Sequence, residues 1–125
     1  MRTRIAIFDD NKNIRNSIVL LLSTDPIFEI VGTFGMAGNL LEKVSQCRPD
    51  VILMDIEMAG IDDTAMLRNL KKALPHIYIL IQTVFEDEER ISKLLQAGAS
   101  GYILKSGLNQ SLRQTIIALK ETGHL

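Results

Sequence analysis

Of the 125 residues, 46% are hydrophobic and 23% are charged, which provides for one globular domain but leaves too little chain for a second. Fourteen Lys and Arg residues nearly balance 15 Asp and Glu residues, which argues against a domain that coats nucleic acid and against a polybasic membrane anchor. The longest apolar runs, 18–22 and 77–81, have five residues, whereas a membrane-spanning helix needs about twenty. The single cysteine, Cys47, excludes an internal disulfide and fits a reducing compartment. We therefore expect one domain over residues 1–125, located in the cytoplasm.

Short hydrophobic runs rich in β-branched residues alternate with longer stretches of helical period. These runs predict five strands, at 4–8, 28–32, 51–54, 77–81 and 101–104. Most of them are hydrophobic almost without interruption, which is typical of parallel strands covered on both faces.

Each helical stretch between the strands has an apolar face. The residues that define these faces are Ile14, Ile18, Leu21 and Leu22; Leu40, Leu41, Val44 and Cys47; Met66, Leu67, Leu70 and Leu74; Ile91, Leu94 and Leu95; and Leu108, Leu112, Thr115, Ile116 and Leu119. The residues expected to cap helix starts are Asp62 or Asp63, Asp87 and Asn109, and Gly98 is expected at a helix end.

This alternation predicts an α/β domain with a flavodoxin-like (βα)5 fold, in which helices cover both faces of one doubly wound sheet. Five parallel strands fit the order 2-1-3-4-5. In that order the first and third strands are neighbours, and a ligand crevice lies beyond their carboxyl ends.

Polar residues follow four of the predicted strands at their carboxyl ends. They are Asp9 and Asp10 after the first strand, Asp55 and Glu57 after the third, Thr83 after the fourth and Lys105 after the fifth. Carboxylates that converge in one crevice repel one another, and Mg²⁺ with its oxygen ligands relieves that repulsion. One carboxylate can then attack phosphorus, while a lysine and a threonine bind the phosphoryl oxygens. The pattern predicts an aspartyl-phosphate site.

Four motifs in this order resemble the receiver domains of two-component response regulators, over essentially the whole chain. They are Phe8-Asp-Asp10, Leu53-Met-Asp-Ile-Glu-Met58, Gln82-Thr83 and Gly101-Tyr-Ile-Leu-Lys105. The stretch 98–106 is most similar to the NarL/FixJ branch of that family, whose members usually continue into a helix-turn-helix DNA-binding domain. We expect such an output domain beyond residue 125, outside this chain; the alternative is a stand-alone receiver.

The resemblance implies a role for each site residue. Asp55 would accept a phosphoryl group from a phosphohistidine on a sensor histidine kinase. Asp10 would bind Mg²⁺ directly, Asp9 largely through water, and the backbone carbonyl of Glu57 would be a further ligand. Thr83 and Lys105 would hold the phosphoryl group, and Tyr102 would be the aromatic residue that rotates when the domain switches.

The same resemblance implies a signalling switch that catalyses its own phosphorylation and slow dephosphorylation, rather than a turnover enzyme. It allows a homodimer, and it implies DNA contact only through the absent output domain and no membrane contact. Three alternatives stay open: a degenerate receiver that acts as an unphosphorylated scaffold, a phosphatase of the haloacid dehalogenase type, and a flavodoxin-like electron carrier. The phosphoacceptor hypothesis requires Asp10, Asp55, Thr83 and Lys105 to meet in one pocket, with Asp55 open to an anion.

Overall fold

In the computed structural model, which describes residues 2–35, 38–57, 63–84 and 86–122, five strands alternate with five helices as the sequence predicts. The elements are β1 (Thr3–Phe8), α1 (Lys12–Ser23), β2 (Phe28–Phe34), α2 (Leu40–Cys47), β3 (Val51–Asp55), α3 (Asp63–Ala73), β4 (Tyr78–Thr83), α4 (Glu88–Ala97), β5 (Gly101–Leu104), the 3-10 turn η1 (Lys105–Gly107) and α5 (Leu108–Thr122).

The strands form one parallel sheet in the order β2-β1-β3-β4-β5, which confirms the predicted topology. β2 extends to Phe34, two residues beyond its predicted end, because Phe8 of β1 still pairs with it there. β4 reaches Thr83, which pairs with Leu104 of β5. Thr83 is therefore the last residue of a strand rather than the first residue of a loop, and the sheet itself fixes its backbone.

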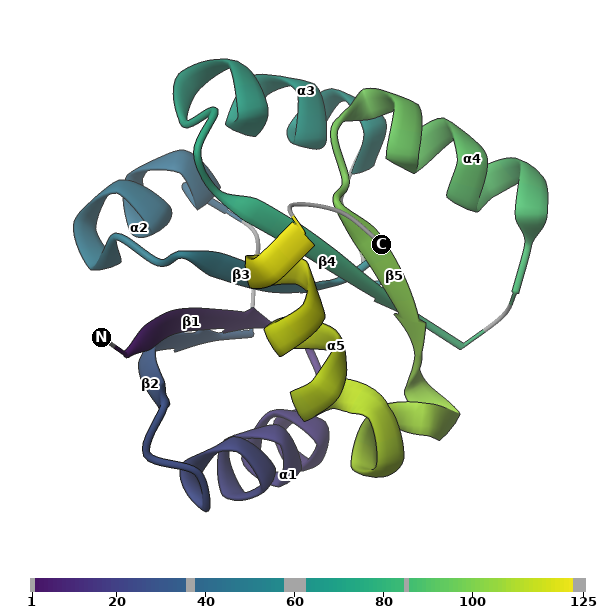
Figure 1. The fold of residues 1–125 in the computed structure, drawn as a ribbon. Coiled ribbons are helices and arrows are strands. Elements are labelled where there is room, and N and C mark those ends of the chain that lie inside the picture. Colours follow the sequence, from purple (N-terminus) through teal and green to yellow (C-terminus); the bar gives the residue numbers. More distant parts are fainter. Residues whose placement is uncertain (1, 36–37, 58–62, 85, 123–125) are drawn as a thin grey trace.

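Helices cover both faces of the sheet, with α1 and α5 on one face and α2, α3 and α4 on the other (Figure 1). Successive residues of β1 therefore enter two different cores: Ala6 and Phe8 pack toward α2, α3 and α4, whereas Ile5 and Ile7 pack toward α1 and α5. Burial on both faces explains the continuous hydrophobic runs in the sequence. Among the residues described, no helix has both the length and the apolar character that a membrane span requires.

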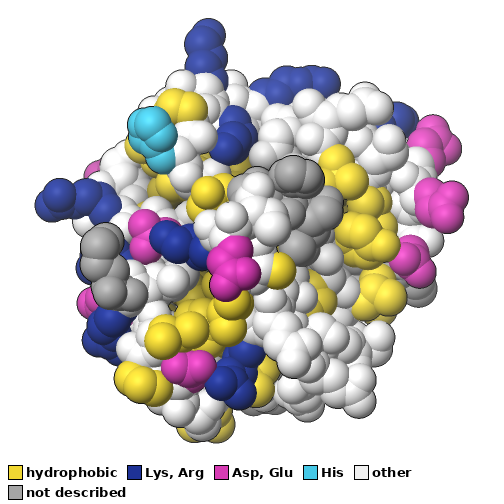
Figure 2. Space-filling model, viewed as in Figure 1, with side chains coloured by type: hydrophobic (Ala, Val, Ile, Leu, Met, Phe, Trp, Pro, Cys, Tyr) yellow, Lys and Arg dark blue, Asp and Glu magenta, His cyan; other side chains and the backbone are white. Residues whose placement is uncertain are grey.

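The helix ends test the predicted caps. Asp87 caps α4 by accepting a hydrogen bond from the Arg90 N–H at 3.2 Å, and Gly98 ends that helix with φ at +129°. Acidic side chains gather where α4 begins, at the right-hand edge of the face shown in Figure 2. The prediction for Asn109 is wrong, because α5 continues directly from η1 and already begins at Leu108. Of the other predicted caps, Asp62 lies outside the described residues, and Asp63 is the first residue of α3.

Candidate functional site

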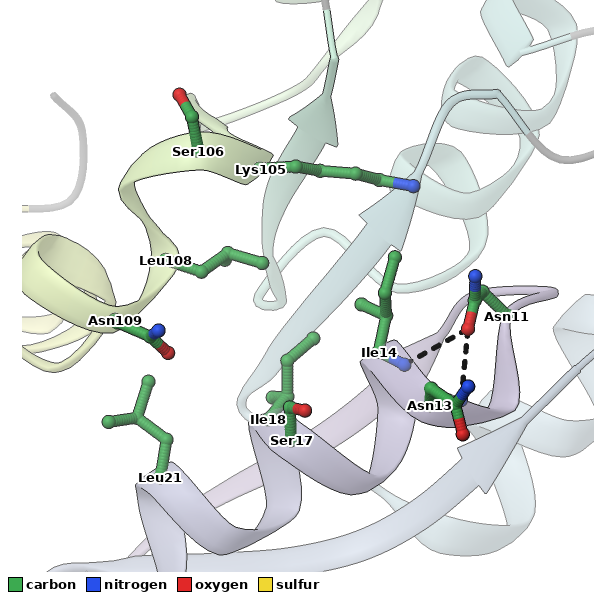
Figure 3. A pocket seen from close by; sticks show the side chains of 10 residues that line it. All are labelled: Asn11, Asn13, Ile14, Ser17, Ile18, Leu21, Lys105, Ser106, Leu108 and Asn109. Atoms are coloured by element: carbon green, nitrogen blue, oxygen red, sulfur yellow. Dashed lines mark hydrogen bonds between the residues drawn. The ribbon is translucent and has the colours of Figure 1, made fainter.

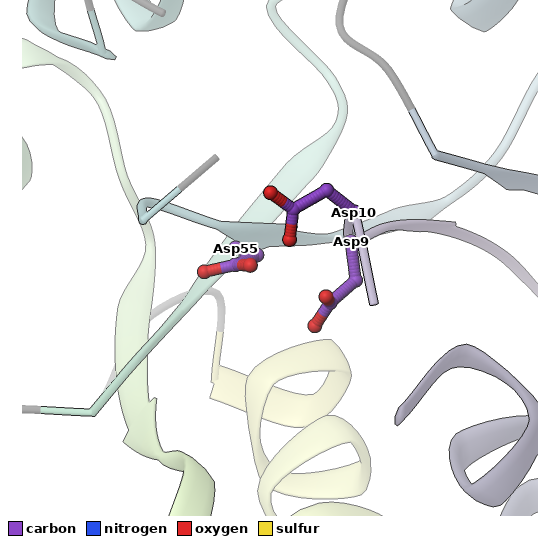
Figure 4. A group of neighbouring side chains, drawn as sticks. All are labelled: Asp9, Asp10 and Asp55. Atoms are coloured by element: carbon purple, nitrogen blue, oxygen red, sulfur yellow. The ribbon is translucent and has the colours of Figure 1, made fainter. Parts of the chain in front are cut away.

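The first feature of the site is a cluster of three carboxylates at the carboxyl ends of neighbouring strands. Phe8 pairs with Met54 in the sheet, so the residues that follow β1 lie beside the end of β3. Carboxylate oxygens of Asp9, Asp10 and Asp55 all lie within 4.8 Å of one another (Figure 4). Asp9 and Asp55 are buried and Asp10 is exposed. The predicted convergence of these three acids is therefore present.

Lys105 brings a positive charge to this cluster from the end of β5. Its Nζ lies 3.0 Å from Asp55 Oδ2 and 3.6 Å from Asp9 Oδ2, and the side chain is 16% exposed. Burial on its own lowers the pKa of Lys105, but the contacts with Asp55 and Asp9 outweigh it and raise the pKa above its usual range. Lys105 is therefore a permanent cation at neutral pH, and its charge is shared between two buried acids.

Asp9 is held by side chains and backbone that the sequence did not assign to the site. The Gln82 Nε2 donates to Asp9 Oδ2 at 2.8 Å, and the Asn11 N–H donates to Asp9 Oδ1 at 2.8 Å. Arg15 Nη1 donates to the Asp9 backbone carbonyl at 2.7 Å. Gln82 is fully buried, and in the sequence it belongs to the Gln82-Thr83 motif, directly after the apolar run 79–81, with no role of its own assigned. These contacts fix the orientation of the Asp9 carboxylate.

The Glu57 side chain takes part in the site, whereas the family resemblance implied a role only for its backbone carbonyl. Glu57 Oε1 accepts hydrogen bonds from the Thr83 hydroxyl at 2.6 Å and from the Val84 N–H at 3.0 Å. The Glu57 N–H donates to Asp55 Oδ1 at 2.9 Å. Burial on its own raises the pKa of Glu57, but the bonds from Thr83 and Val84 outweigh it and lower the pKa. Glu57 is therefore a partly buried carboxylate that links the end of β4 to Asp55.

Burial raises the pKa of the Asp55 carboxyl to about 6. The neighbouring Glu57 and Asp9 carboxyls act in the same direction, while the Glu57 N–H and Lys105 oppose the rise. The Asp55 side chain is only 1% exposed. The expectation that Asp55 is open to an anion is therefore wrong for this conformation, because neighbouring groups, Lys105 among them, cover it. An incoming group can reach Asp55 only after a neighbouring side chain moves.

The donor set fits a magnesium ion. Octahedral Mg²⁺ with oxygen ligands at about 2.1 Å places adjacent ligand atoms about 3 Å apart and opposite ones about 4.2 Å apart. The three carboxylates of the cluster lie within 4.8 Å of one another, so a small contraction brings them into that range. All the donors are hard oxygen atoms, and the acids outnumber the one lysine. Both the geometry and the charge of the cluster therefore suit a hard divalent cation.

Two contacts connect the site to α4 and its preceding loop. Arg90 Nη2 of α4 donates to the Ile56 carbonyl at 2.7 Å, one residue after Asp55. The Tyr102 hydroxyl donates to Glu86 Oε1 at 2.7 Å, and this bond raises the pKa of Tyr102. Tyr102 is half-buried against the core on the α2, α3 and α4 face. The residue predicted as a switch aromatic therefore joins β5 to the segment before α4.

A hollow of about 270 Å³ lies between α1 and the start of α5, beside Lys105 (Figure 3). Its apolar lining includes Ile14, Leu21 and Leu108, and its polar lining includes Asn11 and Asn109. The hollow adjoins the acidic cluster, because Lys105 belongs to both. The surface next to the site is thus concave, with a mixed apolar and amide lining.

Comparisons with known proteins identify relatives of the whole chain. The family model described as the response regulator receiver domain matches residues 5–117. The chain is 31% identical over 122 residues to the transcriptional regulatory protein DegU of Brevibacillus brevis, and the aligned region covers 98% of this chain and 52% of DegU. It is 34% identical over 102 residues to the response regulator GacA of Pseudomonas viridiflava, and this aligned region covers 82% of this chain and 48% of GacA. The chain thus spans about half the length of these curated relatives.

Solved structures agree with this assignment. A two-component response regulator of the LuxR family from Aurantimonas sp. SI85-9A1 has a TM-score of 0.90 and 27% identity, with 99% of this chain and 88% of that chain covered. The signal receiver domain of the putative response regulator NarL from Mycobacterium tuberculosis has a TM-score of 0.88 at 22% identity, over 97% of this chain and 98% of that chain, and supports the fold alone. On the family match, this chain belongs to the response regulator receiver domain family.

Proposed function

We propose that this domain is a phosphoacceptor switch in which Asp55 receives a phosphoryl group from the phosphohistidine of a sensor histidine kinase. The observation that carries the proposal is the meeting of Asp9, Asp10 and Asp55 with Lys105 at one end of the sheet, with Lys105 Nζ at 3.0 Å from Asp55 Oδ2. This set combines a nucleophilic carboxylate, a cation for the transferred group and a place for a metal.

The transfer itself exchanges one bond to phosphorus for another. A carboxylate oxygen of Asp55 forms the new P–O bond while the P–N bond to the kinase imidazole breaks, and the imidazole nitrogen keeps the electron pair and takes up a proton. Lys105 binds one terminal phosphoryl oxygen as a point charge, and the Thr83 hydroxyl donates a hydrogen bond to another. The receiver contributes the nucleophile and the positioning, so it acts as a switch rather than a turnover enzyme.

Mg²⁺ fits the acidic cluster. Asp10 and Asp55 would bind it directly, and Asp9 would bind it largely through water. The Glu57 backbone carbonyl would be a further ligand. When bound, the ion supplies positive charge for the transferred phosphoryl oxygens. Gln82 and Asn11 keep the Asp9 carboxylate turned toward this position. The residues that hold the ion are thus fixed by the carboxyl ends of β1, β3 and β4.

The switch would pass through Thr83 and Tyr102 to α4. Once Thr83 turns toward a phosphoryl oxygen, Tyr102 can rotate inward and give up its bond to Glu86. The hollow beside Lys105 offers the kinase a concave approach to the site. Because the curated relatives are about twice as long as this chain, we also propose a helix-turn-helix output domain that controls transcription.

Acetyl phosphate, a small phosphoryl donor, tests this function without the kinase. With Mg²⁺ the domain should gain one phosphoryl group, seen by intact mass spectrometry as an increase of about 80 Da. The increase should disappear with a chelator and in Asp55→Asn, while Asp50→Asn, a matched change at the opposite end of the sheet, should keep it. A wild-type domain that stays unlabelled would instead favour the unphosphorylated scaffold.

A further inference from the structure

The Glu57 carboxylate occupies a position where two donors of the site converge. The Thr83 hydroxyl and the Val84 N–H both bind a single oxygen atom, Glu57 Oε1, at 2.6 and 3.0 Å. The donors come from the end of β4, while Glu57 follows β3 by two residues, so the contact bridges two strands. A hydroxyl and a backbone N–H that point at one atom can together bind an anionic oxygen, whether it belongs to a carboxylate or to a phosphoryl group.

The same position lies beside the atom that would be phosphorylated. The Glu57 N–H donates to Asp55 Oδ1, so the backbone of Glu57 lies against the nucleophile. A phosphoryl group on Asp55 brings three terminal oxygens with a charge near −2, each of which needs donors or cations. Lys105 can serve only part of that charge, and the Thr83 hydroxyl and the Val84 N–H are further donors, joined to the residue that contacts Asp55 through Glu57 Oε1. In this structure Glu57 already binds both.

The two anions cannot share the position. A carboxylate beside a dianionic phosphoryl group is repelled in a partly desolvated site, where screening is weak. The other oxygen of Glu57, Oε2, is buried and forms no hydrogen bond with the described residues, so the Thr83 and Val84 contacts hold the carboxylate through Oε1 alone. The Glu57 residue is only half-buried, which leaves its side chain a route to solvent.

We propose, on the basis of the phosphoacceptor function above, that Glu57 is a built-in competitor of the phosphoryl group. Its carboxylate holds the Thr83 hydroxyl and the Val84 N–H in the unphosphorylated domain, and it must leave before a phosphoryl group on Asp55 can use them. Glu57 thereby sets how readily the domain switches. Because Arg90 of α4 binds the Ile56 carbonyl next to Glu57, this displacement also reaches the helix that begins near the site.

The experiment compares three variants of the 125-residue chain with the wild type. Glu57→Met removes both acceptor oxygens at similar side-chain length, and Glu57→Gln keeps one acceptor but removes the charge. Both keep the backbone carbonyl of residue 57. Glu121→Gln removes one negative charge from an exposed position on α5 and is the matched control.

The first measurement uses the domain without any phosphoryl group. In ¹⁵N-resolved NMR spectra the Val84 amide proton should lie downfield in the wild type and move upfield in Glu57→Met, because its hydrogen bond is lost. Glu121→Gln should leave the Val84 resonance in place. A Val84 resonance that does not move in Glu57→Met would overturn the proposal, since the contact would not exist in solution.

The second measurement is the affinity for beryllofluoride in the presence of Mg²⁺, since beryllofluoride is a non-covalent stand-in for the phosphoryl group. The Kd should fall at least about fivefold in Glu57→Met, because the Glu57 carboxylate no longer competes for the Thr83 hydroxyl and the Val84 N–H, and by a smaller factor in Glu57→Gln. Glu121→Gln should stay within about twofold of the wild type.

The outcomes separate this proposal from the function on which it rests. If the wild type binds beryllofluoride and Glu57→Met binds it equally or more weakly, the competition is refuted and the phosphoacceptor function stands. If neither the wild type nor the Glu57 variants bind it, the phosphoacceptor function itself is refuted, and the competition with it. The competition is supported if the Glu57 variants bind beryllofluoride more tightly than the wild type does and Glu121→Gln does not.

Discussion

At the amino ends of the strands polar groups are paired with one another, whereas at the carboxyl ends the acids outnumber the cations. Near the amino end, Arg4 donates to the Arg48 and Cys47 carbonyls at 2.9 and 2.7 Å, which completes the end of α2. Asp50 Oδ2 accepts the Arg4 N–H at 2.8 Å, and Ser100 both donates to and accepts from the backbone of Ile79. The donors and acceptors named here are therefore all paired.

The carboxyl end has a different balance. Asp9 and Asp55 are fully buried, Glu57 is partly buried, and Lys105 is the cation that contacts the two aspartates. Unbalanced buried acids destabilise a fold, so a site of this kind marks a place where stability is given up for function. Removing a charge should therefore change the stability differently at the two ends, in size for a lysine and in sign for an aspartate.

The largest expected effect comes from removing the cation of the acidic end. Lys105→Met should lower the free energy of unfolding by about 2 to 4 kcal/mol at pH 7.5 without Mg²⁺, because two buried carboxylates lose their partner. Urea denaturation measures this loss. Lys120→Met is the control at the amino end, since Lys120 is 38% exposed and lies 3.9 Å from Asp50; its effect should stay below about 1 kcal/mol. If both variants lose the same free energy of unfolding, the two ends of the sheet do not differ in charge balance.

The same chemical change should have opposite signs at the two ends. Asp55→Asn should raise the free energy of unfolding by roughly 1 to 3 kcal/mol at pH 7.5 without Mg²⁺, because it removes a buried charge whose pKa lies near 6. Asp50→Asn should lower it, because the Arg4 N–H loses a charged acceptor. Thermal denaturation of both variants gives the comparison. If Asp55→Asn is destabilising, the acidic end is better compensated than its contacts indicate.

The pH dependence gives a smaller effect. The folded domain binds the Asp55 proton more tightly than the unfolded chain does, because the pKa rises from 3.8 to about 6 on folding. The stability from this proton is therefore present at low pH and lost as the pH rises through about 6. Between pH 5 and 8, without Mg²⁺, the wild type should lose about 1 to 2 kcal/mol relative to Asp55→Asn. Denaturation curves at several pH values measure this difference, and an equal response of the two proteins would contradict it.

Much of the fold and of the site could be predicted because the signals are local. An unbroken hydrophobic strand followed by a polar residue identifies both a parallel strand and the position of its carboxyl end, which is how Asp55 and Lys105 could be found. The helix start at Leu108 could not be found this way, because η1 replaces the cap that Asn109 would have supplied.

The contacts within the site were less predictable. Gln82 and Asp9 are 73 residues apart, and Thr83 and Glu57 are 26 apart. Such pairs depend on the orientation that each side chain adopts once the strands are aligned, and the spacing of residues in the sequence does not predict that orientation. The closure of Asp55 by its neighbours follows from the same side-chain packing, so the sequence pattern led to an open site where the structure has a covered one.

The most direct test of the central claim is to locate the phosphoryl group on the chain. After labelling with acetyl phosphate and Mg²⁺, borohydride reduces an aspartyl phosphate to homoserine, and peptide sequencing by mass spectrometry finds the modified position. We expect homoserine at position 55 alone. Homoserine at Asp9 or Asp10, or at no aspartate of a domain that binds Mg²⁺, would contradict it.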